Sequence, residues 1–236
     1  MNDKVLSKRL QLVANFLPNQ ANFVDVGSDH AYLPCYVCSK DKDAIAIAGE
    51  INEGPYLSAK KHVADCHLSD RIQVIKGDGL EVISNHNVDQ IVIAGMGGTL
   101  IRSILTKGQD QLADIQRIIV QPNVDATDVR EWFYQNNYGL VAEEIIKEDG
   151  HIYEILVADR GNATSVYDGK CQESLLLFGP YLIREKNAVF IEKWESEKRK
   201  LERIIKQMNQ AKEVNHQKIE MFQTRIQMIE EVLTHD

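Results

Sequence analysis

The stretch Asp25-Val26-Gly27-Ser28-Asp29-His30-Ala31 decides the fold of this chain. It ends a short apolar strand that begins at Asn22, and a helix is expected to follow over residues 30–39. A buried strand that passes through a glycine turn into a helix opens the nucleotide-binding domains of the α/β class. Dinucleotide-binding dehydrogenases need three glycines in this turn, whereas here Asp29 stands at the position of the second. Because a carboxylate would repel a pyrophosphate, the turn favours a ligand without phosphate groups.

Further apolar segments predict a sheet. Near-continuous runs of isoleucine and valine indicate parallel strands that helices cover on both faces. A helix is expected over residues 127–137, and two more strands, parted by Glu148-Asp149-Gly150, then predict a hairpin. A mostly parallel sheet with an antiparallel hairpin at its end resembles the Rossmann-like α/β domain of class I methyltransferases. The expected strands cover residues 22–26, 44–50, 72–76, 90–95, 117–123, 140–147 and 151–159.

The polar segment 160–169 predicts a domain boundary, with an α/β domain over residues 1–162 and a helical domain over residues 163–236. Apolar residues at alternating spacings of three and four predict a coiled-coil seam in the second domain. The polar stretch 209–216 favours an antiparallel hairpin, because one long helix, the alternative, would leave its seam exposed. The seam residues are Ile191, Trp194, Leu201, Ile205 and Met208, followed by Ile219, Phe222, Ile226, Ile229 and Leu233.

Composition and charge exclude several classes of protein. The chain has 236 residues, and its net charge of −8 lies within residues 1–160, which hold fifteen basic and twenty-three acidic side chains. Bulk charge therefore does not attract phosphates, and contact with a nucleic acid must rest on local patches. No apolar run is long enough to span a membrane, and no signal peptide is evident, so we expect a cytoplasmic protein without a membrane partner.

The chain has four cysteines, Cys35, Cys38, Cys66 and Cys171. The pair Cys35-Tyr36-Val37-Cys38 resembles half of a zinc site or a redox pair. No second close pair and no His-x-x-x-His partner follows in the sequence. We therefore expect reduced thiols and no bound metal.

Polar residues and glycines at the predicted strand ends are candidates for cofactor binding. Asp25 suits the cationic amino-acid end of S-adenosylmethionine, a ligand without phosphate. Glu50 can accept both ribose hydroxyls, although an acid at a helix N-terminus is the alternative. Asp78 can accept from the adenine amino group or simply form a turn, and the glycines of residues 94–98 leave bare backbone beside a cofactor or form a turn without function. The full set is Asp25, Gly27, Ser28, His30, Glu50, Ile51, Asn52, Asp78, Gly79, Ala94, Gly95, Met96, Gly97 and Gly98.

Several of these motifs resemble those of the bacterial tRNA (adenine-22-N1)-methyltransferase family, and the resemblance covers the whole chain. It implies transfer of a methyl group from S-adenosylmethionine to N1 of an adenine in tRNA. The similar segments are residues 6–10 and 25–34, the glycine-rich residues 94–98, and Gln121-Pro122-Asn123.

The implied reaction needs little base chemistry, because neutral adenine N1 already carries a lone pair in the ring plane. The site must align N1 with the sulfonium methyl group and stabilise the positive charge that develops on the base. Asp29 is the first candidate for that charge, with helix capping as the alternative. Gln121 and Asn123 are candidates for hydrogen bonds to the base edge, unless they only form the turn set by Pro122. Tyr32 is a candidate for stacking on a flipped base, unless it belongs to the core.

Phosphate contacts are expected from a basic stretch of the C-terminal helices and from the N-terminal segment, although a solvated helix face is the alternative. The tRNA-binding candidates are Lys8, Arg9, Lys193, Lys198, Arg199, Lys200 and Arg203. We expect a monomer, and a dimer through the C-terminal helices is the alternative.

Two rival functions remain on the sequence alone. The first is a methyltransferase for the adenine N6 amino group, another RNA or a small molecule, although residues 94–98 lack the Asp/Asn-Pro-Pro-aromatic motif typical of N6 enzymes. The second is a non-catalytic RNA-binding protein that retains the fold.

Overall fold

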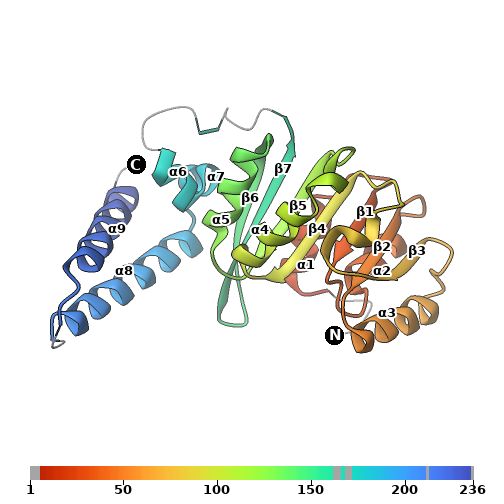
Figure 1. The fold of residues 1–236 in the computed structure, drawn as a ribbon, viewed down its shortest axis with the longest axis horizontal. Coiled ribbons are helices and arrows are strands. Elements are labelled where there is room, and N and C mark those ends of the chain that lie inside the picture. The colour runs from red at the N-terminus through yellow and green to blue at the C-terminus, as the bar shows by residue number, and fades with distance from the viewer. Residues whose placement is uncertain (1–5, 162–165, 168–171, 211–212, 235–236) are drawn as a thin grey trace.

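A computed structural model describes residues 6–161, 166–167, 172–210 and 213–234 of the chain. Within these residues a seven-stranded sheet of order β3-β2-β1-β4-β5-β7-β6 forms the body of the molecule. Its strands are parallel except for β7, which runs antiparallel to β5 and β6. Two long helices extend away from the β6 end of the sheet (Figure 1). The predicted fold class is confirmed.

The elements alternate along the chain as the sequence predicts, with helices between the parallel strands. The α/β part consists of α1 (Lys8–Asn15), β1 (Asn22–Val26), α2 (Tyr32–Lys40), β2 (Ile45–Glu50), α3 (Glu53–Asp65), β3 (Ile72–Lys76), η1 (Gly79–Ile83), β4 (Gln90–Met96), α4 (Gly98–Lys107), η2 (Gln109–Leu112), β5 (Arg117–Pro122), α5 (Ala126–Gln135), β6 (Tyr138–Glu148) and β7 (His151–Arg160). The helices that follow are α6 (Gln172–Phe178), α7 (Pro180–Glu185), α8 (Ala188–Met208) and α9 (His216–Thr234).

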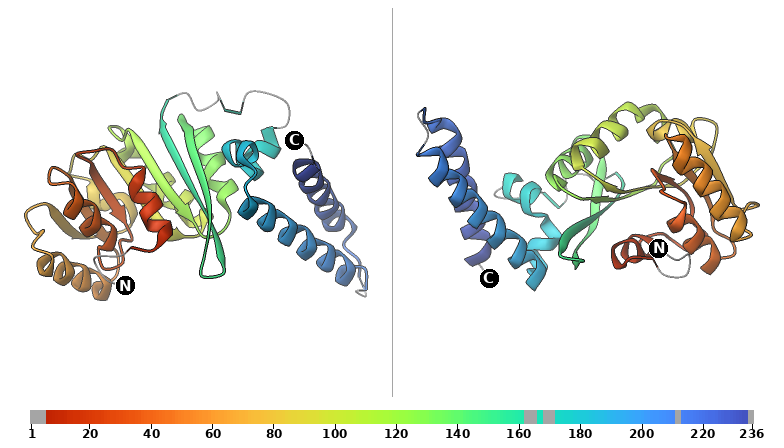
Figure 2. Two further views of the ribbon diagram at one scale, coloured as in Figure 1. Left: turned by 180° about the vertical axis from the view of Figure 1, so that it is seen from behind. Right: turned by 90° about the horizontal axis from the view of Figure 1, so that it is seen from below.

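Each face of the sheet has its own hydrophobic core. Side chains alternate along a strand, so Phe23 and Val24 of β1 lie in different cores. One core packs against η1, α4 and α5, and the other against α1, α2 and α3. Figure 2, in its view from below, shows α4 and α5 on one side of the sheet and α1 and α2 on the other. This two-sided cover explains why the strand sequences are apolar almost throughout.

The structure corrects the bounds of several elements, among them α2, β6, β7 and α5, which ends at Gln135 and not at residue 137. Helix α2 begins at Tyr32 and not at residue 30, because Asp29, His30 and Ala31 have left-handed backbone angles, with φ of 39°, 65° and 56°. Strands β6 and β7 are longer than predicted, since they pair with each other from Tyr138 and Arg160 to the turn at Asp149-Gly150.

The C-terminal helices form the predicted antiparallel hairpin, and the alternative of one long helix is wrong. Trp194, Leu201 and Ile229 of the predicted seam are buried between α8 and its neighbours. Ile191, however, is 38% exposed, and Phe190 is buried in its place. The start of α8 packs on α6 and β6 as well as on its partner helix, and the ring of Phe178 on α6 contacts those of Phe190 and Trp194. The buried face of these first turns is therefore not set by the seam alone.

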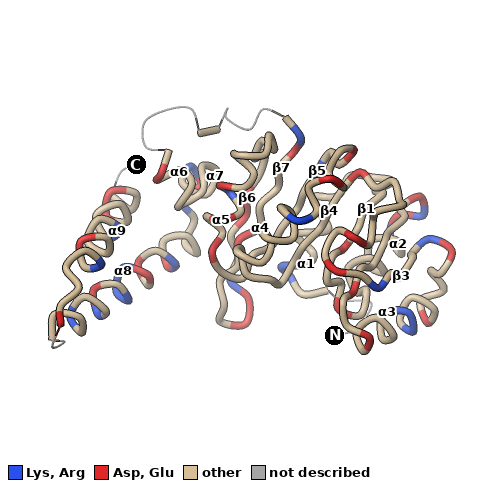
Figure 3. The backbone as a smooth tube through the Cα atoms, in the orientation of Figure 1, with Lys and Arg blue, Asp and Glu red and all other residues tan. Residues whose placement is uncertain are grey.

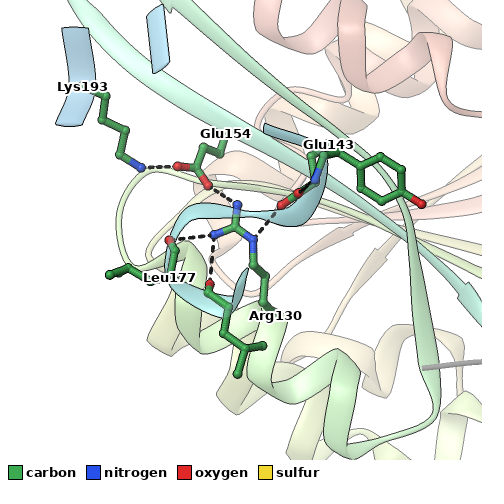
Figure 4. Close-up of polar contacts among 7 residues, drawn as sticks. Arg130, Glu143, Glu154, Leu177 and Lys193 are labelled. Carbon is green, nitrogen blue, oxygen red and sulfur yellow. Dashed lines mark hydrogen bonds and ion pairs between the residues drawn. The ribbon is translucent and has the colours of Figure 1, made fainter. Parts of the chain in front are cut away.

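A buried ionic cluster joins these helices to the sheet (Figure 4). Arg130 on α5 is completely buried and donates to Glu143 on β6 and to Glu154 on β7, each at 2.6 Å. The same guanidinium donates to the carbonyl oxygens of Leu176 and Leu177 at 3.3 Å, and Lys193 on α8 forms an ion pair with Glu154. We call Arg130, Glu143, Glu154 and Lys193 the Arg130 cluster.

The predicted domain division at residues 162 and 163 lies outside the described residues, but the Arg130 cluster connects the parts of the chain before and after it. Charged groups from both sides of that division share the cluster, and Tyr167 packs in the same core as α5. Cys171 also lies outside the described residues. Among the helices that the structure describes, none is both long and apolar enough to cross a membrane.

Candidate functional site

The order of the strands places a ligand site at the carboxyl ends of β1 and β4. Strand β1 pairs with β2 on one side and with β4 on the other. The order in which the chain adds strands to the sheet therefore reverses between β1 and β4. In open α/β sheets, ligands bind in the crevice that such a reversal creates. The glycine turn after β1 and the glycine-rich residues after β4 both lie there.

Two cavities open at this crevice. The first, which we call the Asp25 cavity, has a volume of about 470 Å³ and is lined by Asp25, Ser28, Asp29, His30, Tyr32, Ala94, Gly95 and Arg9, among others. The second, the Asp78 cavity, has a volume of about 310 Å³ and is lined by Ile51, Asp78, Gly79, Leu80, Leu100 and Ile104, among others. Most of the predicted cofactor residues therefore come together around two adjoining spaces.

Gly27 and Met96 line both cavities. Gly27 has a φ of 71°, and a Cβ atom at this position would lie 2.3 Å from Cε of Met96. The close contact puts the Met96 side chain against the glycine turn, where the two cavities meet. A ligand that fills both cavities must pass this contact, so the absence of a side chain at Gly27 determines how closely it can approach the backbone.

Three carboxyl groups make the crevice acidic. Asp25 is buried, and burial raises its pKa to about 7 although Ser28 Oγ donates to its Oδ2 at 2.6 Å; neighbouring Glu50 and Asp29 raise it further. Glu50 is 6% exposed and accepts from the backbone N–H of Asp29 at 2.5 Å. Burial raises the pKa of Glu50 as well. A cationic ligand would relieve this cost by pairing with the buried carboxylates.

The turn that carries Asp29 is strained. Three successive left-handed residues without glycine are uncommon and persist where the surrounding structure holds them. The Asp29 side chain is 80% exposed and lies 3.5 Å from Nε2 of His30. Ala31 is the N-cap of α2, and no side chain caps that helix. The capping alternative for Asp29 is therefore wrong for α2.

A chain of hydrogen bonds joins Arg9 to Gly95, two residues that line the Asp25 cavity, through Gln121 and Asn123, which are not among its lining residues. Arg9 Nη1 donates to Gln121 Oε1 at 2.5 Å, and Gln121 Nε2 donates to Asn123 Oδ1 at 3.0 Å. Asn123 Nδ2 then donates to the Gly95 carbonyl oxygen at 2.8 Å. Gln121 is fully buried, and both ends of its amide group are engaged in this chain. Gln121 is therefore better placed to position Arg9 and Asn123 than to contact a base.

Arg9 comes to the cavity from the first turn of α1, which the tip of the β6–β7 hairpin holds in place. Glu148 accepts from the backbone N–H groups of Lys8 and Arg9, at 2.6 and 3.4 Å. The Arg9 guanidinium also lies over the ring of Tyr153, 5.3 Å from its centroid. The sequence suggested Arg9 as a phosphate contact from its charge alone and gave no signal that it lines the cavity.

Four predicted cofactor residues, Glu50, Asn52, Gly97 and Gly98, do not line either cavity. Gly98 packs against the turn before α5, because a Cβ atom there would lie 1.9 Å from the carbonyl oxygen of Asp125. This glycine therefore serves a close approach between two turns. Gly97 lies beside Val124, and Asn52 is the N-cap of α3 without a capping side-chain bond.

Helix α4 supplies lining residues that the sequence analysis missed. Leu100, Ser103, Ile104 and Lys107 all line the Asp78 cavity. Leu100 is 53% exposed, and Ile51, which directly follows β2, is 56% exposed. The helical pattern of α4 indicates which face is apolar, but no sequence signal indicates that this face also borders a cavity.

The basic residues of α8 are largely paired. Lys193 belongs to the Arg130 cluster, and Lys198 Nζ lies 2.5 Å from Glu230 on α9. Arg199 pairs with Glu195 and Lys200 with Glu197 on the same helix, whereas Arg203 is exposed. Figure 3 shows basic and acidic residues mixed along both helices. Residues 184–206 hold eight basic and five acidic side chains, and this net charge of +3 is therefore spread over a face of mixed charge.

Comparison with known proteins identifies the family. The model of the family described as TrmK, tRNA (adenine(22)-N(1))-methyltransferase, matches residues 23–231. The chain is 48% identical over 237 residues to the tRNA (adenine(22)-N(1))-methyltransferase of Bacillus subtilis (strain 168), with 100% of both chains covered. The chain belongs to the TrmK family.

Solved structures of the TrmK family agree with this assignment. The crystal structure of the B. subtilis M1A22 tRNA methyltransferase TrmK aligns with a TM-score of 0.92 and 46% identity over 98% of this chain and 99% of that one. A putative tRNA (m1A22) methyltransferase from Streptococcus pneumoniae, in complex with S-adenosyl-L-methionine, aligns at 0.86 and 41% over 97% and 100%. TrmK of M. capricolum, in complex with S-adenosyl-homocysteine, aligns at 0.83 and 31% over 96% of both chains.

Proposed function

We propose that this chain transfers the methyl group of S-adenosylmethionine to N1 of adenine 22 in tRNA. Membership of the TrmK family, over residues 23–231 and at full length against a curated relative, is the observation that carries the proposal. The acidic crevice with two adjoining cavities supports it, because the cofactor joins a cationic amino-acid end to an uncharged nucleoside.

The two cavities suggest how the cofactor lies. Asp25 would hold its ammonium group in the Asp25 cavity, and Glu50 would accept its ribose hydroxyls at the boundary. The adenine would enter the Asp78 cavity, between the exposed apolar side chains of Ile51 and Leu100. The sulfonium methyl group would then face the Asp25 cavity, which remains for the target base.

The chemistry needs alignment more than acid–base catalysis. The N1 lone pair attacks the methyl carbon, the carbon–sulfur bond breaks, and its electron pair neutralises the sulfonium as S-adenosylhomocysteine leaves. The positive charge passes to the adenine ring, and no proton has to move for the new bond to form. We assign Asp29 to stabilising that charge and Tyr32 to stacking on the base. Asn123, with Gln121 as its positioning residue, donates to the carbonyl oxygen of Gly95, which lines the cavity.

A transfer assay tests the proposed function. The purified chain should move labelled methyl groups from S-adenosylmethionine to an unmodified tRNA transcript. The matched control is the same transcript with guanine in place of adenine 22, which should accept none. Binding of the cofactor without transfer to any tRNA would favour the non-catalytic alternative.

Substitution of Glu50 should weaken cofactor binding. Glu50→Gln keeps an oxygen that can accept from the Asp29 N–H group but loses the charge that strengthens hydrogen bonds to the ribose. We expect S-adenosylmethionine affinity to fall about tenfold, which corresponds to roughly 1.4 kcal/mol. Calorimetry measures this, with Glu53→Gln as control, since Glu53 is exposed and pairs with Lys76. An unchanged affinity in folded Glu50→Gln would remove the ribose assignment.

Cofactor binding should depend on pH through Asp25. Its pKa of about 7 means that the carboxyl is neutral below that pH and ionised above it. Only the ionised form pairs with an ammonium group, so affinity should rise about tenfold from about pH 6 to about pH 8. The Asp25 carboxyl holds its proton more tightly in the folded state than in the unfolded state. In the absence of cofactor, Asp25 therefore lowers the free energy of unfolding as pH rises from about 4 to about 7. A calorimetric pH series tests the binding effect, and Asp25→Asn should flatten it; a flat wild-type series would refute the pairing.

We also propose that tRNA contacts the exposed basic residues of α8 and the N-terminal segment with Lys8 and Arg9. The catalytic part is acidic, so phosphate contacts need local basic groups. Arg9 is well placed for a phosphate of the target nucleotide, because its guanidinium lines the Asp25 cavity itself. Lys193 is a poorer candidate than the sequence suggested, because its ammonium group pairs with the buried Glu154.

Charge removal on α8 should reduce the salt dependence of tRNA binding. In a variant with Arg199, Lys200 and Arg203 changed to Gln, each lost phosphate contact should reduce the log–log salt slope by about 0.7–0.9. Filter binding at several salt concentrations measures the slope. Lys60→Gln with Lys61→Gln, on the exposed face of α3, is the control. An unchanged slope in the α8 variant would show that these residues form only a solvated helix face.

We place this activity in the cytoplasm, because that is where a bacterial tRNA methyltransferase meets its substrate. A monomer is the proposed state. The seam of α8 packs within the chain against α9 and the elements around β6, which supports the monomer over the dimer alternative.

A further inference from the structure

A cysteine–histidine cluster lies behind the strained turn, outside the proposed catalytic site. Cys35 on α2 lies near His62 of α3 and Cys66, the C-cap residue of α3, and one metal-ligating atom of each lies within 4.8 Å of the others. His62 and Cys66 are four residues apart, so they project from the same side of the helix. Cys35 is buried, whereas His62 and Cys66 are half-buried, which gives an ion a path from solvent.

The hydrogen bond of His62 suits a metal ligand. Nδ1 of His62 donates to the backbone carbonyl oxygen of His30 at 2.6 Å. This bond places the proton on Nδ1 and leaves the lone pair of Nε2 for a metal. Histidines that bind metals usually donate their other ring nitrogen to a carbonyl or carboxylate in this way. The ring of Tyr32 packs against His62 with its centroid 4.9 Å away and restricts its orientation.

The donor set selects the class of ion. Two thiolates and one imidazole favour a soft or borderline metal such as Zn²⁺ over Mg²⁺ or Ca²⁺. Zinc lies about 2.3 Å from sulfur and about 2.0 Å from nitrogen, so tetrahedral ligand atoms are about 3.5–3.8 Å apart. Since the three ligand atoms lie within 4.8 Å of one another, closing the cluster needs a shift of at most about 1 Å. Binding would release the two thiol protons.

We propose that Cys35, His62 and Cys66 form a three-ligand Zn²⁺ site with an open fourth position for water. The bond from His62 to His30 links the site to the turn that carries Asp29, so a bound ion would hold α2, α3 and that turn together. The sequence predicted no metal, because no second close pair follows Cys35 and Cys38. The structure instead brings His62 and Cys66 to Cys35, and Cys38 is not part of the cluster.

Cobalt binding tests this proposal on the full chain. Cys171 lies outside the described residues and could supply a thiolate, so all variants carry Cys171→Ser. Reduced, metal-free protein is titrated with Co²⁺, whose thiolate bonds give a charge-transfer absorption band. We expect one equivalent of Co²⁺ to bind with this band and Zn²⁺ to displace it.

Matched variants decide which residues bind. Cys35→Ser and Cys66→Ser should each weaken Co²⁺ binding by at least about tenfold. Changing a residue that only supports a metal ligand already lowers metal affinity by about tenfold or more, and loss of a ligand should cost no less. Cys38→Ser, a buried cysteine on the same helix as Cys35, should leave it unchanged. Circular dichroism and S-adenosylmethionine binding verify that each variant is folded, and Cys66→Ser, at the end of α3, serves if Cys35→Ser does not fold. Absence of the band in the parent protein, or unchanged Co²⁺ affinity in folded Cys66→Ser, would overturn the proposal.

Discussion

Replacing Asp29 by asparagine is expected to slow methyl transfer on the order of 100-fold in a single turnover, while the affinity for S-adenosylmethionine stays nearly unchanged. The side chain lines the Asp25 cavity and is 80% exposed, so it is free to face a base that enters. Its charge matters most when the adenine becomes cationic, which is why the rate should respond and cofactor binding should not. Single-turnover kinetics with saturating enzyme separates the two quantities.

Asn at position 29 keeps the size and the tolerance for left-handed backbone angles that this turn needs. The variant therefore tests the charge and not the fold of the turn. Asp70→Asn, an exposed acid at the opposite end of the sheet, is the control. A preserved single-turnover rate in Asp29→Asn would show that the carboxylate does not stabilise the transition state.

Breaking the Arg130 cluster should lower the free energy of unfolding by about 3–5 kcal/mol. Arg130→Met leaves Glu143 and Glu154 buried without the guanidinium that neutralises them. Burial raises the pKa of Glu143 even with Arg130 present, so the carboxyl is already costly to keep ionised. Urea denaturation of the variant measures the loss. If Arg130→Met does not fold, Glu143→Gln removes one partner with less change of shape and should show a smaller loss.

The pair Lys147–Glu192 provides the matched control. It also joins the sheet to α8, but its side chains are 43% and 47% exposed. Lys147→Ala should therefore cost less than about 1 kcal/mol. Equal losses in the two variants would contradict the role assigned to burial.

The Arg130 cluster also determines how the role of the C-terminal helices can be tested. A chain cut near the predicted boundary at residue 162 would lose Lys193 and the carbonyl partners of Arg130 and would expose the core that contains Phe178. Such a truncation changes stability together with tRNA binding. Charge substitutions on α8 test tRNA contact without that complication.

The fold was predictable because its signals are local. Runs of isoleucine and valine marked the parallel strands, the Asp149-Gly150 turn marked the hairpin, and the polar stretch after Met208 marked the reversal between α8 and α9. Periodicity was misleading at Ile191, because the start of α8 also packs on Phe178 of α6 and buries Phe190 instead.

The site was predictable only in part, because much of it comes from residues far apart in the sequence. Asp25 and Asp78 stand at strand ends, where the topology itself places them at the crevice. Arg9 reaches the same crevice through a hydrogen bond to Gln121, more than a hundred positions away, and no local pattern announces such a contact. Cys35 gains His62 and Cys66 as neighbours in the same way, through the packing of α2 on α3.

Nucleoside analysis of the methylated tRNA tests the central claim most directly. An unmodified tRNA transcript is incubated with the enzyme and S-adenosylmethionine, digested to nucleosides and analysed by mass spectrometry with chromatographic standards. The proposed function predicts 1-methyladenosine, which is absent without the enzyme and absent when position 22 is guanine. The appearance of N6-methyladenosine instead, or of 1-methyladenosine that persists in the guanine-22 transcript, would contradict it.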